Sequence, residues 1–141
     1  MAQETQSMFP ERIVFVDDDE DIRYLARCGF EEQDDIVFMT CQSGEELLLR
    51  IRELQPDLII LDMRLNGMDG VDTLEALREH PDAEDIPVIF ITGKQDLHML
   101  ERYYRLGVIG VIHKPVNPSE IALKIMEIWR KRGGEQASAK T

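Results

Sequence analysis

Five short apolar runs punctuate the chain at regular intervals, at residues 13–16, 36–39, 58–61, 88–91 and 108–112. Several are almost continuously apolar rather than alternating, which is typical of strands buried on both faces of a sheet. The segments between and after them carry apolar residues three and four positions apart, which is the spacing of one helical face. The pattern therefore predicts five strands alternating with five helices.

The expected inward faces of the five helices come from this spacing. They consist of Ile22, Leu25, Ala26 and Phe30; of Leu47, Leu48, Ile51 and Leu54; of Val71, Leu74 and Leu77; of Leu97, Leu100 and Tyr104; and of Ile121, Ile125, Ile128 and Trp129. Ser43 followed by Glu46 is typical of a capped helix start, and Pro118 suits a first helical position. The cations at 130–132 suit the end of the last helix. This order of elements predicts an α/β fold, a doubly wound parallel sheet with helices on both faces.

Composition and charge narrow the function classes. The chain has 141 residues, a formal net charge of −12 and 43% hydrophobic residues, enough for one domain with a core. The excess of acidic residues argues against direct binding to nucleic acid and against binding to an anionic membrane surface. Residues 1–10 lack the order of a signal peptide, and no apolar run is long enough to span a membrane. With Cys28 and Cys41 interpreted as reduced thiols, we expect a cytoplasmic protein.

Polar residues follow the predicted strands where each strand ends. The acidic run Asp17–Asp21 follows the first, Asp62 ends the third, Thr92 ends the fourth, and Lys114 follows the fifth. The carboxyl ends of parallel strands meet at one edge of the sheet, where such folds place their sites. Crowded carboxylates repel each other unless a cation lies among them, and an oxygen-only donor set suits Mg²⁺. Lys114 and Thr92 could contact phosphate oxygens, so the set predicts phosphoryl transfer, with an aspartate as nucleophile.

Four sequence segments resemble the response-regulator receiver family of two-component signalling. They are the strand and acidic pair in 13–23, the strand and loop in 56–70, Val88–Gly93, and His113-Lys114-Pro115. They occur in the family's order and at similar spacings, and together the resemblance covers residues 12–132. The family fold that it implies is flavodoxin-like, with strand order 2-1-3-4-5. We expect a receiver domain over 11–132, with 1–10 and 133–141 as flexible tails or linker.

The resemblance also implies a role for each site residue. Asp62 would take the phosphoryl group from a phosphohistidine on a sensor histidine kinase or a histidine phosphotransfer protein. Asp17, Asp18, Asp62 and the backbone carbonyl of Arg64 would hold Mg²⁺, with Mn²⁺ as a substitute. Thr92 and Lys114 would contact the phosphoryl oxygens, and the Lys114–Pro115 bond would be cis. Such a domain is a switch rather than an enzyme with a turnover substrate, and its output would be an unknown downstream protein or an attached effector.

The chain departs from the family pattern in two places. Val111 stands where the fifth strand normally carries an aromatic residue, so we expect output through the Thr92 loop and the following helix. Asn66 replaces a frequent proline. We also hypothesise that Arg64 and Lys94 set the dephosphorylation rate. On the fourth helix, we expect Tyr104 to pack inward and Met99 and Tyr103 to be partly exposed. The face from the fourth helix to the fifth helix could form a phosphorylation-dependent homodimer.

Two alternatives stay open. Asp17-x-Asp19 resembles the start of the motif of a small phosphohydrolase with an aspartyl nucleophile, of the haloacid-dehalogenase type, although Asp21 stands where that family prefers Thr or Val. Phosphoryl labelling of Asp17 rather than Asp62 would favour it. The other alternative is a receiver-like interaction domain that is never phosphorylated, which the intact set of acids, Thr92 and Lys114 argues against.

Overall fold

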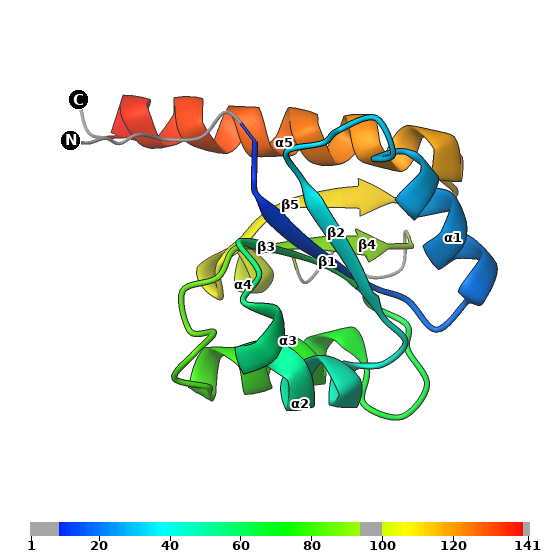
Figure 1. The fold of residues 1–141 in the computed structure, drawn as a ribbon. Coiled ribbons are helices and arrows are strands. Elements are labelled where there is room, and N and C mark those ends of the chain that lie inside the picture. The colour runs from blue at the N-terminus through cyan, green and yellow to red at the C-terminus, as the bar shows by residue number, and fades with distance from the viewer. Residues whose placement is uncertain (1–8, 94–99, 140–141) are drawn as a thin grey trace.

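The computed structural model describes residues 9–93 and 100–139. Its five parallel strands are β1 (Arg12–Val16), β2 (Val37–Cys41), β3 (Leu58–Asp62), β4 (Val88–Thr92) and β5 (Val108–His113). They form one sheet in the order β2-β1-β3-β4-β5 (Figure 1). The predicted fold and strand order are therefore confirmed, with strand bounds shifted by one or two residues.

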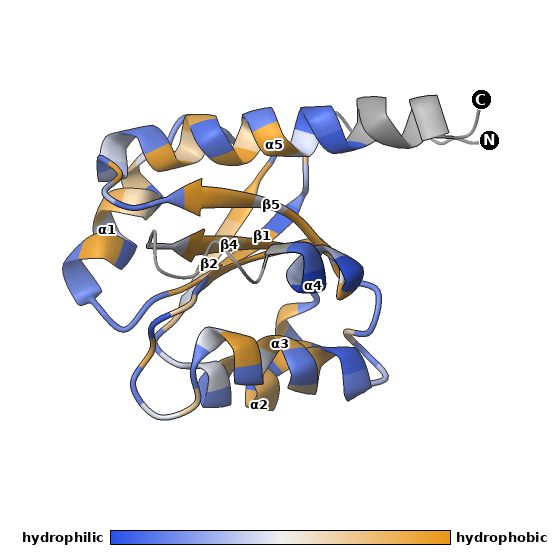
Figure 2. Ribbon diagram, turned by 180° about the vertical axis from the view of Figure 1, so that it is seen from behind, coloured by the Kyte–Doolittle hydropathy of each residue, from blue (hydrophilic) through white to orange (hydrophobic). Residues whose placement is uncertain are grey.

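The helices α1 (Glu20–Cys28), α2 (Gly44–Leu54), α3 (Gly70–Glu79), α4 (Leu100–Arg105) and α5 (Pro118–Ala139) alternate with the strands. Strand residues alternate in direction, so each strand feeds two separate cores. Val14, Ile59 and Phe90 join the core under α2, α3 and α4. Phe15, Ile60 and Ile91 join the core under α1 and α5. Apolar strands thus lie between helices that present polar residues outward (Figure 2).

Helix ends follow the local chemistry predicted for them. The Ser43 hydroxyl accepts the N–H of Glu46 at 3.0 Å, while the Glu46 carboxylate reaches back to the N–H of Gln42 at 2.8 Å. Helix α5 begins at Pro118, as expected, but it ends at Ala139 rather than at Arg132. That prediction was wrong: the helix runs through Gly133 and Gly134 and continues into Glu135, Gln136 and Ala137, which are residue types that favour helix.

The predicted inward face of α4 was also wrong. Tyr103 is buried, at 2% exposure, whereas Tyr104 is 49% exposed. The Tyr103 ring meets the Phe90 ring edge-on, with 5.1 Å between the ring centroids. Helix α4 therefore presents Tyr103, and not Tyr104, to the sheet. In α1, Leu25 is likewise 43% exposed, because the buried stripe of this nine-residue helix centres on Ala26. Leu97 and Met99 lie outside the described residues.

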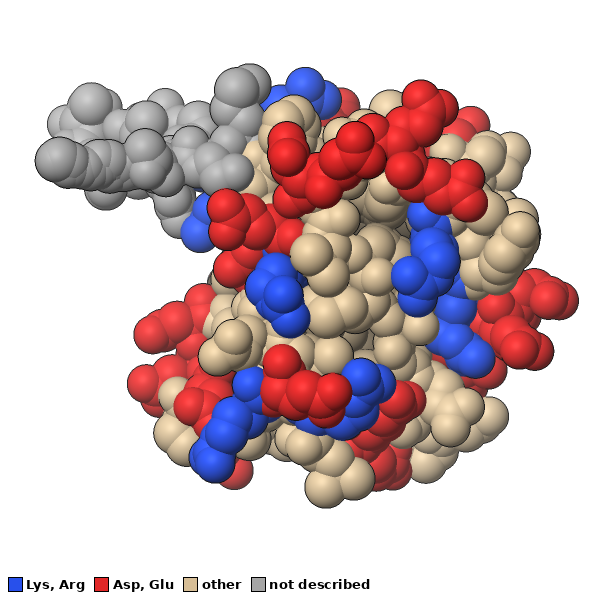
Figure 3. All heavy atoms as spheres, viewed as in Figure 1, with Lys and Arg blue, Asp and Glu red and all other residues tan. Residues whose placement is uncertain are grey.

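Acidic side chains dominate the visible surface, with lysine and arginine between them (Figure 3). This distribution agrees with the net charge of −12. Both cysteines, Cys28 and Cys41, are free thiols. Within residues 9–93 and 100–139, no helix has the length and apolar character that crossing a membrane requires.

Candidate functional site

Asp17 and Asp62 form a buried carboxyl pair at the carboxyl edge of the sheet. Asp17 directly follows β1 and Asp62 ends β3, and the Asp62 carboxyl lies close enough to Asp17 to raise its pKa. Only 5% of Asp17 and 4% of Asp62 is exposed. Each carboxylate accepts one local backbone N–H: Asp17 from Asp19 and Asp62 from Arg64, both at 2.9 Å. Two adjacent buried acids are costly when both are ionised, so this pair needs positive charge nearby.

Lys114 supplies that charge from the segment after β5. Its Nζ lies 3.0 Å from Oδ1 and 3.1 Å from Oδ2 of Asp62. The Lys114 N–H donates to the Thr92 carbonyl at 2.8 Å, which joins the ends of β4 and β5 beside the acids. Thr92 is buried, and its hydroxyl donates to the Gly93 carbonyl at 3.1 Å. The Lys114–Pro115 bond is cis, as expected.

The acids open onto a cleft of about 710 Å³. Asp18 is an exposed residue of this cleft, and its Oδ2 accepts the N–H of Asn66 at 3.1 Å. Arg64 lines the cleft too, while Lys94 lies outside the described residues. The lining also includes a group of apolar residues: Ile22, Ile91, Val116, Pro118 and Ile121. The cleft therefore combines charged and apolar lining residues beside the buried acids.

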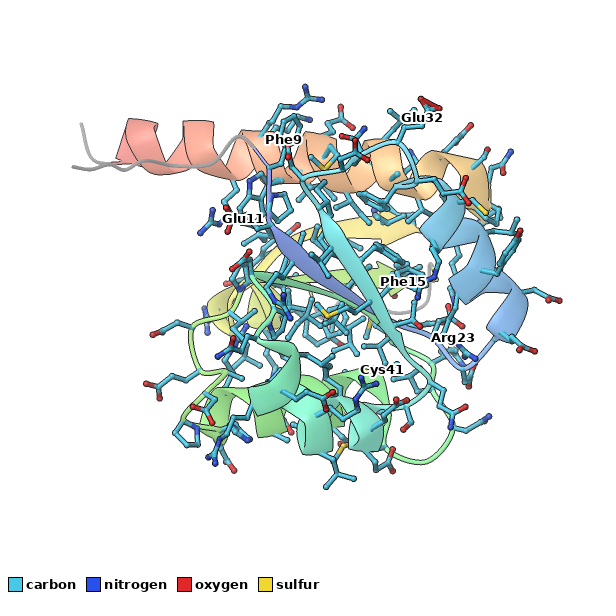
Figure 4. All side chains as sticks on the ribbon, in the orientation of Figure 1. Phe9, Glu11, Phe15, Arg23, Glu32 and Cys41 are labelled. Carbon is cyan, nitrogen blue, oxygen red and sulfur yellow. The ribbon has the colours of Figure 1, made fainter. Side chains whose placement is uncertain are left out.

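Sequence reasoning missed two supports of the acidic run. Arg23 on α1, labelled in Figure 4, donates from Nη1 to the Asp17 carbonyl at 2.7 Å. Asp19 caps α1 by accepting the N–H groups of Asp21 and Ile22 at 2.8 and 3.3 Å. The position of Asp19 just before the helix is a recognisable cap signal, whereas nothing in the sequence marks Arg23. The acidic run therefore serves both the site and the start of α1.

The donor set fits a hard cation. In the described part of the chain, no three His, Cys, Asp or Glu side chains are gathered closely enough to hold a metal ion by themselves. Mg²⁺ needs only one or two carboxylates, because it keeps several waters and takes other oxygens. Asp17 and Asp62 are buried, in contact with each other and open to the cleft on one side. A divalent cation here would relieve the repulsion between them, which Lys114 only partly offsets.

Burial raises the pKa of Asp17 from 3.8 to about 6; the N–H of Asp19 opposes this shift, the carboxyl of Asp62 adds to it and Lys114 opposes it. Because the folded state binds this proton more tightly than the unfolded chain does, ionising Asp17 destabilises the fold. In metal-free buffer, the stability that protonated Asp17 contributes is fully present below pH 4 and is lost as the pH rises through 6. The free energy of unfolding falls over this range by up to about 3 kcal/mol. We expect Asp17→Asn to gain stability over the wild type across this range, as measured by urea unfolding. Parallel pH profiles of the two proteins would contradict this prediction.

Comparisons with known proteins identify one family for this chain. The response regulator receiver domain model matches residues 13–126. The chain is 29% identical over 127 residues to the phosphate regulon transcriptional regulatory protein PhoB of Rhizobium meliloti, covering 90% of this chain and 56% of that protein. It is 30% identical over 132 residues to the DNA-binding response regulator MtrA of Mycobacterium tuberculosis, covering 90% and 54%. The chain thus spans about half the length of these curated relatives.

Solved structures show the same fold. The receiver domain of NtrX from Brucella abortus is 25% identical, with a TM-score of 0.68 over 83% of this chain and 97% of that one. The chemotaxis response regulator CheY4 of Vibrio cholerae is 21% identical, with a TM-score of 0.71 over 83% and 97%. Domains of this kind are signalling modules that generally use Mg²⁺ for phosphorylation. This chain belongs to the response-regulator receiver family, the phosphoacceptor domains of two-component signalling.

Proposed function

We propose that Asp62 is the phosphoacceptor, and that its donor is the phosphohistidine of a sensor histidine kinase or of a histidine phosphotransfer protein. The observation that carries the proposal is a buried carboxylate at a strand end, in contact with Asp17 and with Lys114 Nζ within 3.1 Å of both its oxygens. Burying a carboxylate beside a second one is a costly way to stabilise a fold, which favours a chemical role for Asp62. The cleft beside it gives a donor access.

In the transfer, an Asp62 oxygen attacks phosphorus while the bond from phosphorus to the donor imidazole nitrogen breaks. The imidazole leaves with that electron pair and takes a proton from solvent, and Asp62 becomes an acyl phosphate. Lys114, freed from its bidentate contact, binds a phosphoryl oxygen, and the Thr92 hydroxyl turns from the Gly93 carbonyl to donate to another. Such catalysis consists mainly of positioning and charge neutralisation.

Asp17, Asp18, Asp62 and the backbone carbonyl of Arg64 would hold Mg²⁺, or Mn²⁺ in its place. The bound ion would neutralise negative charge on the transferring group and on the carboxylates. Arg64 lies at the mouth of the cleft, where its exposed side chain could obstruct or orient the water that hydrolyses the acyl phosphate. Together with Lys94, we assign it the control of phosphoryl lifetime.

The output is proposed to be a switched protein-binding surface over α4, β5 and α5. Phosphorylation adds about −1.5 to −2 charges at Asp62, which can shift a two-state population. This face is also our candidate for a phosphorylation-dependent homodimer. The names of PhoB and MtrA describe transcriptional or DNA-binding regulators, but only about half of their length corresponds to this chain. For the domain itself, over 11–132, we propose a cytoplasmic switch with no turnover substrate and no direct contact with nucleic acid or membrane.

The intact mass of the protein tests this proposal after incubation with acetyl phosphate and Mg²⁺. The wild type is expected to gain one base-labile phosphoryl group, and Asp62→Asn none, because an amide cannot serve as the nucleophile. Asp72→Asn is the matched control, since Asp72 is an exposed aspartate in the first turn of α3 and should leave labelling unchanged. Omitting Mg²⁺ should abolish the adduct.

The other outcomes separate the alternatives. An adduct that persists in Asp62→Asn and disappears in Asp17→Asn would assign the chemistry to an aspartyl phosphohydrolase. The absence of any adduct on the wild type, together with no binding of a metal-dependent fluoride mimic of phosphate, would indicate an interaction domain that is never phosphorylated.

A further inference from the structure

Each of the three carboxylates assigned to the metal site accepts one backbone N–H. The bonds to Asp17 and Asp62 come from the residue two positions later in the same loop. The bond to Asp18 is different, because its donor is Asn66, 48 residues away, at 3.1 Å from Oδ2. It connects the loop after β1 with the loop after β3.

This connection bears on two of the assigned metal ligands at once. Asp18 is exposed, so its side chain would otherwise sample several rotamers in solvent. Asn66 lies two residues after Arg64, whose backbone carbonyl is the fourth assigned ligand. A single bond from Asn66 to Asp18 therefore fixes the Asp18 carboxylate relative to the chain segment that carries the Arg64 carbonyl.

The loop that carries the Asn66 N–H is itself held in place from the other side. Glu45, in the first turn of α2, accepts the N–H of Met68 at 3.1 Å through Oε2. The intervening Gly67 has a φ of +76° and passes so close to the Glu45 carboxylate that an added Cβ would lie 2.9 Å from Oε2. Only glycine adopts this close, left-handed turn without strain. The direction of the Asn66 N–H is thus set by the fold and not by solvent.

We infer that Asn66 is a positioning residue for the metal site: its main-chain N–H orients the Asp18 carboxylate and ties it to the Arg64 loop. Hydrogen bonds to ligating carboxylates preorganise metal sites, and their loss typically lowers affinity about 10-fold to 100-fold. Proline, which has no N–H, could not make this contact, whereas any other residue could. The inference rests on the proposed function, since it assigns Asp18 to that metal site.

Calorimetric titration with Mg²⁺ of the wild type, Asn66→Ala and Asn66→Pro tests the inference without any phosphoryl transfer. Asn66→Ala keeps the backbone N–H and should bind Mg²⁺ as the wild type does. Asn66→Pro should bind about tenfold more weakly, the low end of the range because the bond is exposed. Urea unfolding in metal-free buffer checks that both variants are folded. If proline disturbs the loop, an ester in place of the peptide bond between Leu65 and Asn66 removes only the main-chain N–H. It should weaken Mg²⁺ binding by the same factor.

The outcomes distinguish this inference from the proposed function. Equal Mg²⁺ affinity in all the variants would overturn the positioning role while leaving the metal site intact. Tighter binding by Asn66→Pro or by the ester would also overturn it, since the N–H would then compete with the ion for Asp18. A wild type that binds no Mg²⁺ would refute the metal site itself, and the inference with it.

Discussion

Replacing Gly70 with alanine is expected to lower the free energy of unfolding by about 3 kcal/mol, although Gly→Ala in a helix normally gains up to about 1 kcal/mol. Gly70 is the first residue of α3, and an added Cβ would lie 2.6 Å from the Met63 Cα and 2.7 Å from the Asp62 carbonyl oxygen. Both obstructing atoms belong to backbone at the end of β3. They cannot rotate away, so either α3 or β3 must shift. Chemical denaturation of Gly70→Ala measures the cost.

Gly44 provides the matched control, because the obstruction there is a side chain. A Cβ on Gly44 would clash with Oγ1 of Thr73 on α3, and Thr73→Ala removes that atom. Gly44→Ala should therefore destabilise, and Gly44→Ala with Thr73→Ala should recover part of the loss. The recovery should be incomplete, because Thr73→Ala also removes the hydrogen bond from the Thr73 hydroxyl to the Asp69 carbonyl. That bond contributes about 1 kcal/mol. If Gly70→Ala cost no more than the double variant, the backbone contact would not be the constraint described here.

The features that could be predicted from the sequence are those with a local chemical signature. Buried strands are marked by continuous apolar runs such as Leu58–Leu61, and parallel pairing then brings the ends of distant strands together. That logic is sufficient to place Asp17, Asp62 and Lys114 at one edge without any coordinate. The cap at Ser43 and the start of α5 at Pro118 also follow from local chemistry.

The features that were missed depend on tertiary contacts. Helical periodicity cannot separate Tyr103 from Tyr104 in a six-residue helix, because the choice is made by the Phe90 ring that one of them meets. The same holds for Arg78, whose guanidinium donates to the carbonyls of Leu106, Ala83, Glu84 and Ile86. It thereby links the chain before β4 to the turn before β5, and its burial lowers its pKa. An arginine on the polar side of a helical pattern gives no sign of such a role.

Lys114→Met should slow phosphorylation of Asp62 by acetyl phosphate about 100-fold, the usual effect of removing one preorganised charge donor from a transfer site. Lys114 Nζ contacts both Asp62 oxygens, and methionine keeps much of the aliphatic stem while removing the charge. Stability should also fall in metal-free buffer, by about 1–2 kcal/mol, because two carboxylates lose their nearest cation. The figure is modest because the lysine side chain is 40% exposed and its pair is partly screened.

Magnesium should reverse the loss of stability but not the loss of rate. An ion that neutralises Asp17 and Asp62 replaces the lysine charge in the resting protein, so saturating Mg²⁺ should stabilise Lys114→Met more than the wild type, where lysine competes for the same oxygens. The ion cannot replace the lysine at the phosphoryl oxygen, so transfer stays slow. Lys124→Met, at an exposed position on α5, is the control and should alter neither measurement. An equal stabilisation of Lys114→Met and wild type by Mg²⁺ would show that Lys114 and the ion do not share Asp62, and the arrangement proposed for this site would then be wrong.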